Sequence, residues 1–287
     1  MKCFLSILLL GLSLCSYAQK DSSFSFVFMT DIHLKNEPHI LQGFRTAVAE
    51  INRYQPDFIL SGGDQVYDVM RGNVDASDSL FNLYTREAKA LKAPVYNTVG
   101  NHELFGIYKE SPTDSTHSLY KYGMYKKHFK ELYYSFDYKG WHFIVLNNLD
   151  AAGFAYYSAF DQEQLGWLKR DLAKLDSNTP VVMMMHVPIV SVQNQLDLPK
   201  EGPSFGPDIK YKDQLLQIIE PYNIQLVLQG HLHYFEDIQV KGKTRFITGS
   251  AIAGRPSWKG QRNGPPGFLV FRINGDKYSY EFVPLKR

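Results

Sequence analysis

Short apolar runs alternate with helix-like segments along most of the chain, and this alternation limits the fold more than any other feature. Strand-like runs end near residues 29, 60, 99, 185 and 228. Between the first two, Ile40, Phe44, Val48 and Ile51 recur at helical spacing. Three further pairs of runs flank short turns and are expected to form hairpins: 133–138 with 141–147, 235–240 with 245–248, and 267–273 with 278–283. Hairpins inserted into strand–helix units predict a layered α/β sandwich with mixed sheets.

The size of the chain suits a single domain. It has 287 residues, of which 44% are hydrophobic, enough apolar material for one large core. Internal repeats, low-complexity tracts and linkers are absent from the sequence. We therefore expect one domain over residues 19–287, preceded by a separate segment, 1–18.

The first residues have the pattern of a secretory signal peptide. Met1-Lys2 is followed by an apolar run over 4–14 and by Ser16-Tyr17-Ala18, a small-x-small cleavage site. The alternatives are an uncleaved anchor or a buried helix. We predict cleavage after Ala18 and export to the periplasm or the extracellular space. Both cysteines, Cys3 and Cys15, lie in this segment, so disulfides are not expected in the mature chain.

Charge and hydropathy limit the kinds of partner that this chain is expected to bind. The formal net charge is +2, without the clear basic excess typical of proteins that bind nucleic-acid phosphates, so we expect no specific nucleic-acid partner. A small anionic substrate needs only a local basic pocket. A second apolar stretch long enough to cross a membrane is absent, so no span is expected in the mature chain. The oligomeric state is not indicated.

Five polar segments stand out because each follows a predicted strand, which is where α/β folds place ligands. They are Asp31-Ile32-His33, Gly63-Asp64, Gly100-Asn101-His102-Glu103, His186, and Gly230-His231-Leu232-His233. Each segment alone is commonplace, as a turn or a solvated histidine. Their occurrence together in one chain favours a shared site.

The residue types in these segments suit a pair of divalent metal ions. Carboxylate and carbonyl oxygens favour manganese or magnesium, imidazoles favour zinc or iron, and a mixed set tolerates several metals. In an extended chain, residues i and i+2 point to the same side, so Asp31 and His33 can reach one ion together, and His231 and His233 can each face one of the pair. The glycines at 63, 100 and 230 are expected to let the backbone approach the ions.

In this order, the five segments resemble the calcineurin-like metallophosphoesterase superfamily over residues 31–233. The resemblance implies a four-layer α/β/β/α sandwich with two mixed β-sheets around a dimetal site. It implies two divalent ions, with manganese, iron and zinc as the leading metals. One ion would be held by Asp31, His33, Asp64 and His233. Asp64 would be shared with the second ion, completed by Asn101, His186 and His231. His102 would sit beside the leaving group without binding metal.

The implied function is hydrolysis of a small phosphorylated substrate. A hydroxide shared by two ions would attack phosphorus in line, and His102 would protonate the leaving oxygen or neutralise its charge. Diesterases and monoesterases share this ligand set, and the resemblance favours a phosphodiesterase. The alternatives are an acid-phosphatase-like monoesterase and a metal-retaining binding protein without catalysis. Inactive members usually lose ligands, and every ligand position is filled in this chain.

One segment also resembles the purple acid phosphatases, a related branch. Gly63-Asp64-Gln65-Val66-Tyr67 is similar to their Gly-Asp-x-x-Tyr, whose tyrosine binds ferric iron. That branch has glycine where this chain has His33. We therefore expect His33 to take the coordination place of the tyrosine and Tyr67 to pack nearby or support a ligand.

Three segments are candidates for the rim of the site. Residues 104–130 are rich in Tyr and Lys and follow the Asn-His-Glu loop directly, residues 250–266 combine Trp258 with Arg255, Lys259 and Arg262, and residues 188–207 form a third loop. Aromatic rings and cations beside a dimetal site would hold a base or a second phosphate. The alternative is a solvated basic surface.

Overall fold

The computed structural model describes residues 22–192, 209–252 and 265–285. The predicted signal peptide lies outside these residues. So do most of the candidate rim segment 250–266 and of the segment 188–207.

The first large sheet is built from both ends of the chain. Its strand order is β13-β12-β1-β2-β3. The parallel strands are β1 (Phe24–Met29), β2 (Phe58–Ser61) and β3 (Val95–Asn97). The hairpin of β12 (Gly267–Asn274) and β13 (Lys277–Pro284) adds to β1 in antiparallel fashion. The sheet is therefore mixed, as predicted.

The second large sheet has the order β10-β11-β9-β8-β5-β4. Its parallel centre contains β5 (Trp141–Val145), β8 (Val181–Met184), β9 (Ile224–Gln229) and β11 (Thr244–Thr248). Antiparallel edges are supplied by β4 (Tyr134–Tyr138) and β10 (Glu236–Val240). All three predicted hairpins are thus confirmed.

The two sheets face each other through an aromatic core. Alternate residues of a strand point to opposite faces, so Phe24, Phe26 and Phe28 of β1 face the second sheet, while Val27 and Met29 face the helices. The Phe26 ring stacks on Phe271 with centroids 4.6 Å apart and on Phe58 at 5.3 Å, and meets Phe143 of the other sheet edge-on at 5.6 Å. These contacts fix the two sheets relative to each other.

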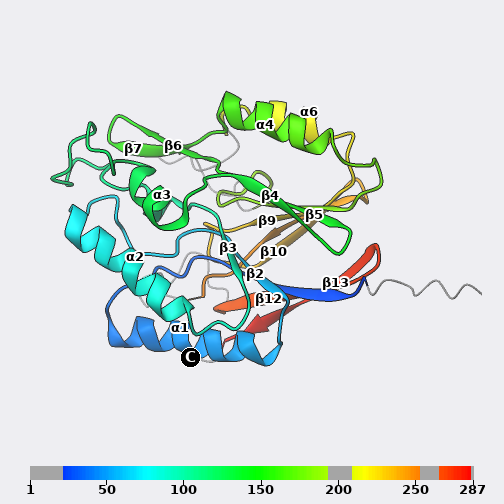
Figure 1. Cartoon of the computed structure of the whole chain (residues 1–287), viewed down its shortest axis with the longest axis horizontal. Helices are drawn as coiled ribbons and strands as arrows, with labels where there is room; N and C mark the ends of the chain where they lie inside the picture. Colours follow the sequence, from blue (N-terminus) through cyan, green and yellow to red (C-terminus); the bar gives the residue numbers. More distant parts are fainter. Residues whose placement is uncertain (1–21, 193–208, 253–264, 286–287) are drawn as a thin grey trace, which may run out of the picture.

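Helices cover the outer faces of both sheets, which gives the four layers visible in Figure 1. Helices α1 (Pro38–Arg53) and α2 (Val74–Ala88) lie beside the first sheet, and Phe44 of α1 contacts Tyr84 of α2 with ring centroids 6.1 Å apart. Helices α4 (Gln162–Leu172) and α6 (Lys212–Ile219) cover the second sheet with buried leucines and isoleucines. The predicted α/β/β/α sandwich is confirmed.

Three small elements escaped the sequence analysis. They are the 3-10 turn η1 (Asn101–Glu103), helix α3 (Gly123–Phe129), and the hairpin of β6 (Leu149–Ala152) with β7 (Ala155–Ser158). The hairpin turns through Gly153 and Phe154, which both have positive φ. Each element is too short to show a clear period in sequence. None of the helices within the described residues has the length and hydropathy needed to cross a bilayer.

We predict that the stacked ring of Phe26 is a main source of stability. Its side chain is fully buried between the sheets, so Phe26→Ala leaves a cavity and should lower the free energy of unfolding by about 3–5 kcal/mol. Urea unfolding followed by circular dichroism measures this loss. Phe154→Ala is the control, because that ring is 65% exposed at the β6–β7 turn and should cost almost nothing. Equal effects of the two changes would contradict the packing described.

Candidate metal centre

The loops after β1, β2, β8 and β9 meet at one edge of the sandwich and bring the predicted ligands together. Possible ligand atoms gather within 4.8 Å of one another in two groups. The groups are Asp31, His33, Asp64 and His233, and Asp64, His186 and His231. Asp64 belongs to both groups. All of these side chains are buried except those of His231 and His233, which are partly exposed.

The first group has closely spaced carboxylate and imidazole atoms. His233 Nε2 lies 3.1 Å from Asp31 Oδ1, and His33 Nε2 lies 3.5 Å from Asp64 Oδ2. The two Nε2 atoms of His33 and His233 approach to 3.2 Å. Four side chains from three loops therefore converge on one point.

Asn101 lies against the second group, where the resemblance implied a further ligand. His186 Nε2 lies 3.3 Å from Asp64 Oδ2 and 3.2 Å from Asn101 Oδ1. Asn101 Oδ1 also lies 2.9 Å from His231 Nδ1. The seven predicted ligands thus form two adjacent clusters that share Asp64.

The backbone at the site differs from the extended conformation assumed in the sequence analysis. Asp31, His33, Asp64, His231 and His233 have φ between 48° and 70°, the left-handed region. The pairs i and i+2 therefore converge through strained loops after the strands, and the extended-chain argument was wrong. Hydrogen bonds between loops maintain this conformation, from Asp31 N to Gly63 O (3.1 Å) and from His33 N to Asp64 O (2.8 Å). Such strain is commonly retained at functional sites.

Two of these glycines, Gly100 and Gly230, leave no space for a side chain. A Cβ at Gly100 would collide with the backbone nitrogen and carboxylate of Asp64, and a Cβ at Gly230 would collide with Thr30 and Asp31. The missing side chains therefore make room for the two carboxylates.

Glu103, the last residue of the Gly100–Glu103 segment, supports the loops that carry the ligands. Its buried carboxylate accepts hydrogen bonds from Asp64 N (2.9 Å), Gly100 N (2.7 Å) and Val66 N (3.0 Å). It thereby ties the loop of Asp64 to the loop of Asn101 and His102. Burial, with repulsion from Asp64, raises the pKa of Glu103 to about 8. In the sequence, only its place after Asn101-His102 indicated that Glu103 belongs near the site.

Hydrogen bonds and burial set the protonation of the site. His186 Nδ1 donates to Gly62 O at 2.8 Å, which turns Nε2 toward Asp64. Burial would lower the pKa of His186, but attraction to Asp64 and hydrogen bonds raise it to about 9, so a bound metal would displace a proton from this ring. Burial lowers the pKa of His231 to about 3, with repulsion from His186 adding to it, so this ring is neutral. Burial alone would raise the pKa of Asp31, but attraction to His233 and hydrogen bonds hold it well below its usual value. Neutral imidazoles and ionised carboxylates are the forms that bind metals.

His102 lies beside the clusters, with its backbone N–H bonded to Asp64 Oδ1 at 2.9 Å. Its Nδ1 accepts a hydrogen bond from Asp68 N at 3.0 Å, so the proton of the neutral ring is on Nε2. The ring meets that of His33 edge-on at 4.5 Å and lies near Tyr67 at 5.7 Å. Lys35 Nζ lies 4.8 Å from the centre of the Tyr67 ring.

Tyr156 borders the centre, and Tyr108 packs against Arg71 of a neighbouring loop. Tyr156 of β7 is buried, with its ring edge-on to His231 at 6.3 Å. Tyr108, in the predicted rim segment 104–130, stacks beneath the guanidinium of Arg71 at 4.1 Å. Arg71 also donates to both oxygens of Asp68 at 3.0 Å. The β6–β7 hairpin that carries Tyr156 had no sequence signal.

The donor set fits divalent metal ions. Zinc lies about 2.0–2.2 Å from nitrogen and oxygen ligands, so two ligands of one ion lie about 3–3.5 Å apart. The spacings of 2.9–3.5 Å among the paired ligand atoms match this value. A mixed set of carboxylates, amide and imidazoles in two clusters with one shared carboxylate suits two ions.

Comparison with known proteins agrees with the fold. The family model described as calcineurin-like phosphoesterase matches residues 24–235. Purple acid phosphatase 22 of Arabidopsis thaliana is 29% identical over 198 residues, which are 66% of this chain and 41% of that protein. The chain spans about two fifths of the length of such curated relatives.

Two solved structures share the fold. A dimetal phosphatase from Danio rerio has a TM-score of 0.63 and 15% identity, with 92% of this chain and 96% of that one covered. GAP50, the anchor in the inner membrane complex of Plasmodium, has a TM-score of 0.55 and 16% identity over 92% and 85% of the two chains. The family match covers most of the chain and every residue of the two clusters, so the chain belongs to the calcineurin-like phosphoesterase family.

Proposed function

We propose that this protein is a metal-dependent phosphoester hydrolase whose two ions share Asp64. The observation that carries the proposal is the position of Asp64, which is buried and common to both ligand clusters. Asp31, His33 and His233 would complete the first metal site, and Asn101, His186 and His231 the second. Manganese, iron and zinc all suit this mixed donor set.

When bound by the two ligand clusters, divalent ions would supply activation of water near neutral pH and charge neutralisation on the phosphoryl oxygens. The chain's own part is to hold the ligands before metal and substrate arrive. His186 is oriented by Gly62 O, and the carboxylate of Asp31 by hydrogen bonds from Thr30 Oγ1 (2.7 Å) and His231 N (2.9 Å). Such fixed ligands limit the reorganisation needed during the reaction.

His102 would act on the leaving group. Because its Nδ1 is engaged by Asp68 N, its Nε2–H is the group available to a substrate oxygen. A hydrogen bond from Nε2–H would stabilise the charge that develops on the leaving oxygen. The ring is held between His33 and Tyr67, which restricts its rotation.

We propose a phosphomonoester as the preferred substrate, although the sequence analysis favoured a diester. The curated relatives that match are purple acid phosphatases, and the Danio rerio structure is a dimetal phosphatase. A small diester is the second candidate, because His33 stands in the first cluster where the purple acid branch has glycine.

We propose that residues 1–18 are removed as a signal peptide and that residues 19–287 form one domain acting outside the cytoplasm. The single domain is supported by β12, which lies beyond the family match yet pairs with β1 in the centre of the first sheet.

A binding protein without catalysis is the competing function. GAP50 shows that a protein with this fold can be an anchor, so the fold alone does not establish turnover. The complete set of predicted ligands in one place favours the enzyme.

We predict metal-dependent hydrolysis of para-nitrophenyl phosphate by the protein loaded with manganese or zinc. Bis-para-nitrophenyl phosphate should be hydrolysed more slowly, as judged by kcat/KM from nitrophenol release. Removing the metals with a chelator should abolish both activities, and adding metal back should restore them. Faster turnover of the diester would reverse the proposed preference, and failure to turn over either ester with metals bound would favour the binding protein.

Asp64→Ala should reduce the metal content below two ions per chain, because both clusters lose a ligand. Elemental analysis after dialysis measures the stoichiometry. The matched control is Asp78→Ala, which removes an aspartate that pairs with Lys127 and His128 away from the site. Two retained ions in the Asp64 variant would contradict its bridging role.

His102→Ala should keep both ions and lower kcat by about 10²–10⁴-fold, the usual contribution of a positioned proton donor. Metal content and kcat are measured on the same sample. His39→Ala serves as control, since this side chain is 60% exposed in α1. An unchanged kcat in the His102 variant would exclude a role at the leaving group, and loss of metal would make it a ligand.

A further inference from the structure

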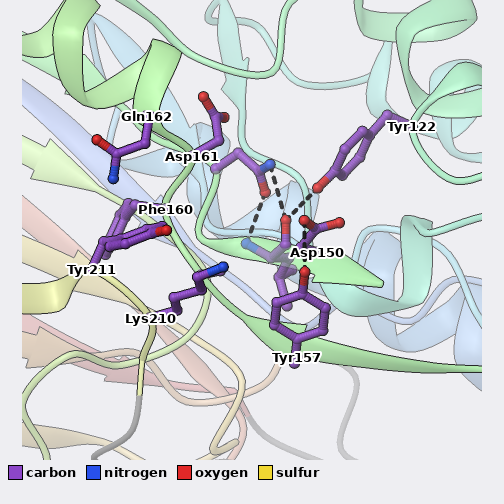
Figure 2. A pocket seen from close by; sticks show the side chains of 11 residues that line it. Tyr122, Asp150, Tyr157, Phe160, Asp161, Gln162, Lys210 and Tyr211 are labelled. Carbon is purple, nitrogen blue, oxygen red and sulfur yellow. Dashed lines mark hydrogen bonds between the residues drawn. The ribbon is translucent and has the colours of Figure 1, made fainter. Parts of the chain in front are cut away.

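A cavity lies apart from the two ligand clusters. It has a volume of about 180 Å³ and is bounded by the β6–β7 hairpin, the start of α4 and the residues just before α6. None of the eight predicted site residues lines it. Figure 2 shows Tyr122, Asp150 and Tyr157 on one side, and Phe160, Lys210 and Tyr211 across from them.

The cavity occupies a position where α/β folds hold ligands. Asn147 in its wall follows the carboxyl end of β5, and β5 pairs in parallel with β8, whose end carries His186. The hairpin forms the partition between cavity and metal centre. Tyr156 of β7 points toward His231, and the next residue, Tyr157, faces the cavity, as alternation along a strand requires.

The lining combines aromatic rings with charges of both signs. Tyr122, Tyr157, Phe160 and Tyr211 supply the apolar surface. The carboxylates are those of Asp150 and Asp161, and the cation is Lys210, whose Nζ lies 4.9 Å from the centre of the Tyr211 ring. Within the described parts of the chain, Lys210 has no carboxylate within ion-pair distance.

Asp150 is fixed as a hydrogen-bond acceptor. It pairs with Lys121, and its Oδ2 accepts from Tyr157 Oη at 2.9 Å. Burial opposes its ionisation, but the hydrogen bond from Lys121 and those from Ala151 and Tyr157 hold the pKa of Asp150 below its usual value. The cavity therefore presents an ionised acceptor opposite an ammonium donor (Figure 2).

The backbone beside the cavity is strained. Tyr211 at the start of α6 has φ 64°, and Lys121 has φ 57°. The left-handed region is an outlier for a bulky side chain such as tyrosine, and strain of this kind is retained where the surrounding structure requires it. At Tyr211 it places the aromatic ring under Lys210.

These charges select the chemistry of the ligand. A free anion would meet Asp150 and Asp161, and a free cation would meet Lys210 and Lys121. Hydroxyl groups can donate to the carboxylates and accept from the ammonium at once. The aromatic walls suit a ring with apolar faces. We infer that this cavity binds a neutral polyhydroxylated ring, the chemistry of a hexose unit, between Asp150 and Lys210.

Saturation-transfer NMR titrations with the methyl glycosides of glucose, galactose, mannose and N-acetylglucosamine test this inference on the full mature chain. At least one glycoside should bind saturably. Lys210→Met and Asp150→Asn should weaken it at least about tenfold, the loss expected for a hydrogen bond to a charged group. Lys241→Met, in the exposed β10–β11 turn, is the matched control and should bind like the parent protein.

Hydrolysis of para-nitrophenyl phosphate by the Lys210 and Lys241 variants is measured in parallel and should be unchanged. Comparing glycoside binding with hydrolysis distinguishes this cavity from the metal centre, because glycoside binding does not depend on turnover. Absence of saturable binding by all four glycosides overturns the inference. Glycoside binding that neither Lys210→Met nor Asp150→Asn weakens also overturns the inference. So does a result in which the protein binds inorganic phosphate through Lys210 and does not bind the glycosides.

Discussion

The carboxylate of Asp64 is the point on which the whole site depends. Its Oδ2 lies 3.5 Å from His33 Nε2 of the first group and 3.3 Å from His186 Nε2 of the second. A buried carboxylate is costly unless positive or polar partners surround it. Burial alone would raise the pKa of Asp64, but attraction to His186 holds it far below the ordinary value. The backbone N–H of His102 donates a hydrogen bond to this carboxylate, and Glu103 accepts one from the backbone N–H of Asp64. Together these bonds fix the position of Asp64. Remove this carboxylate, and the two clusters lose their common member.

The sandwich brings the ends of strands from both sheets to this carboxylate. Asp31 and Asp64 follow strands of the first sheet, and His186 and His231 follow strands of the second. The aromatic layer around Phe26 and Phe143 sets the distance between the sheets. Packing deep in the core therefore controls how closely ligands from opposite sheets approach.

Most of the fold and the set of residues at the centre were predictable from sequence. Apolar runs ending in Asp, Asn or His mark strands whose loops meet, so the gathering of Asp31, Asp64, Asn101 and His231 follows from a general rule of α/β folds. The left-handed backbone at Asp31 and His33 was not predictable, because it is imposed by hydrogen bonds to a loop some thirty residues away. The same holds for Glu103, whose role depends on two backbone donors from the loop of Asp64 and one from its own loop. The β6–β7 hairpin was missed since its eight strand residues show neither period clearly.

Anomalous diffraction from crystals grown with manganese or zinc tests the central claim most directly. The account predicts two peaks about 3.5–4 Å apart with one oxygen of Asp64 between them. Asp31, His33 and His233 should contact one peak, and Asn101, His186 and His231 the other. A single peak that Asp64 does not touch, or peaks elsewhere on the molecule, would contradict it.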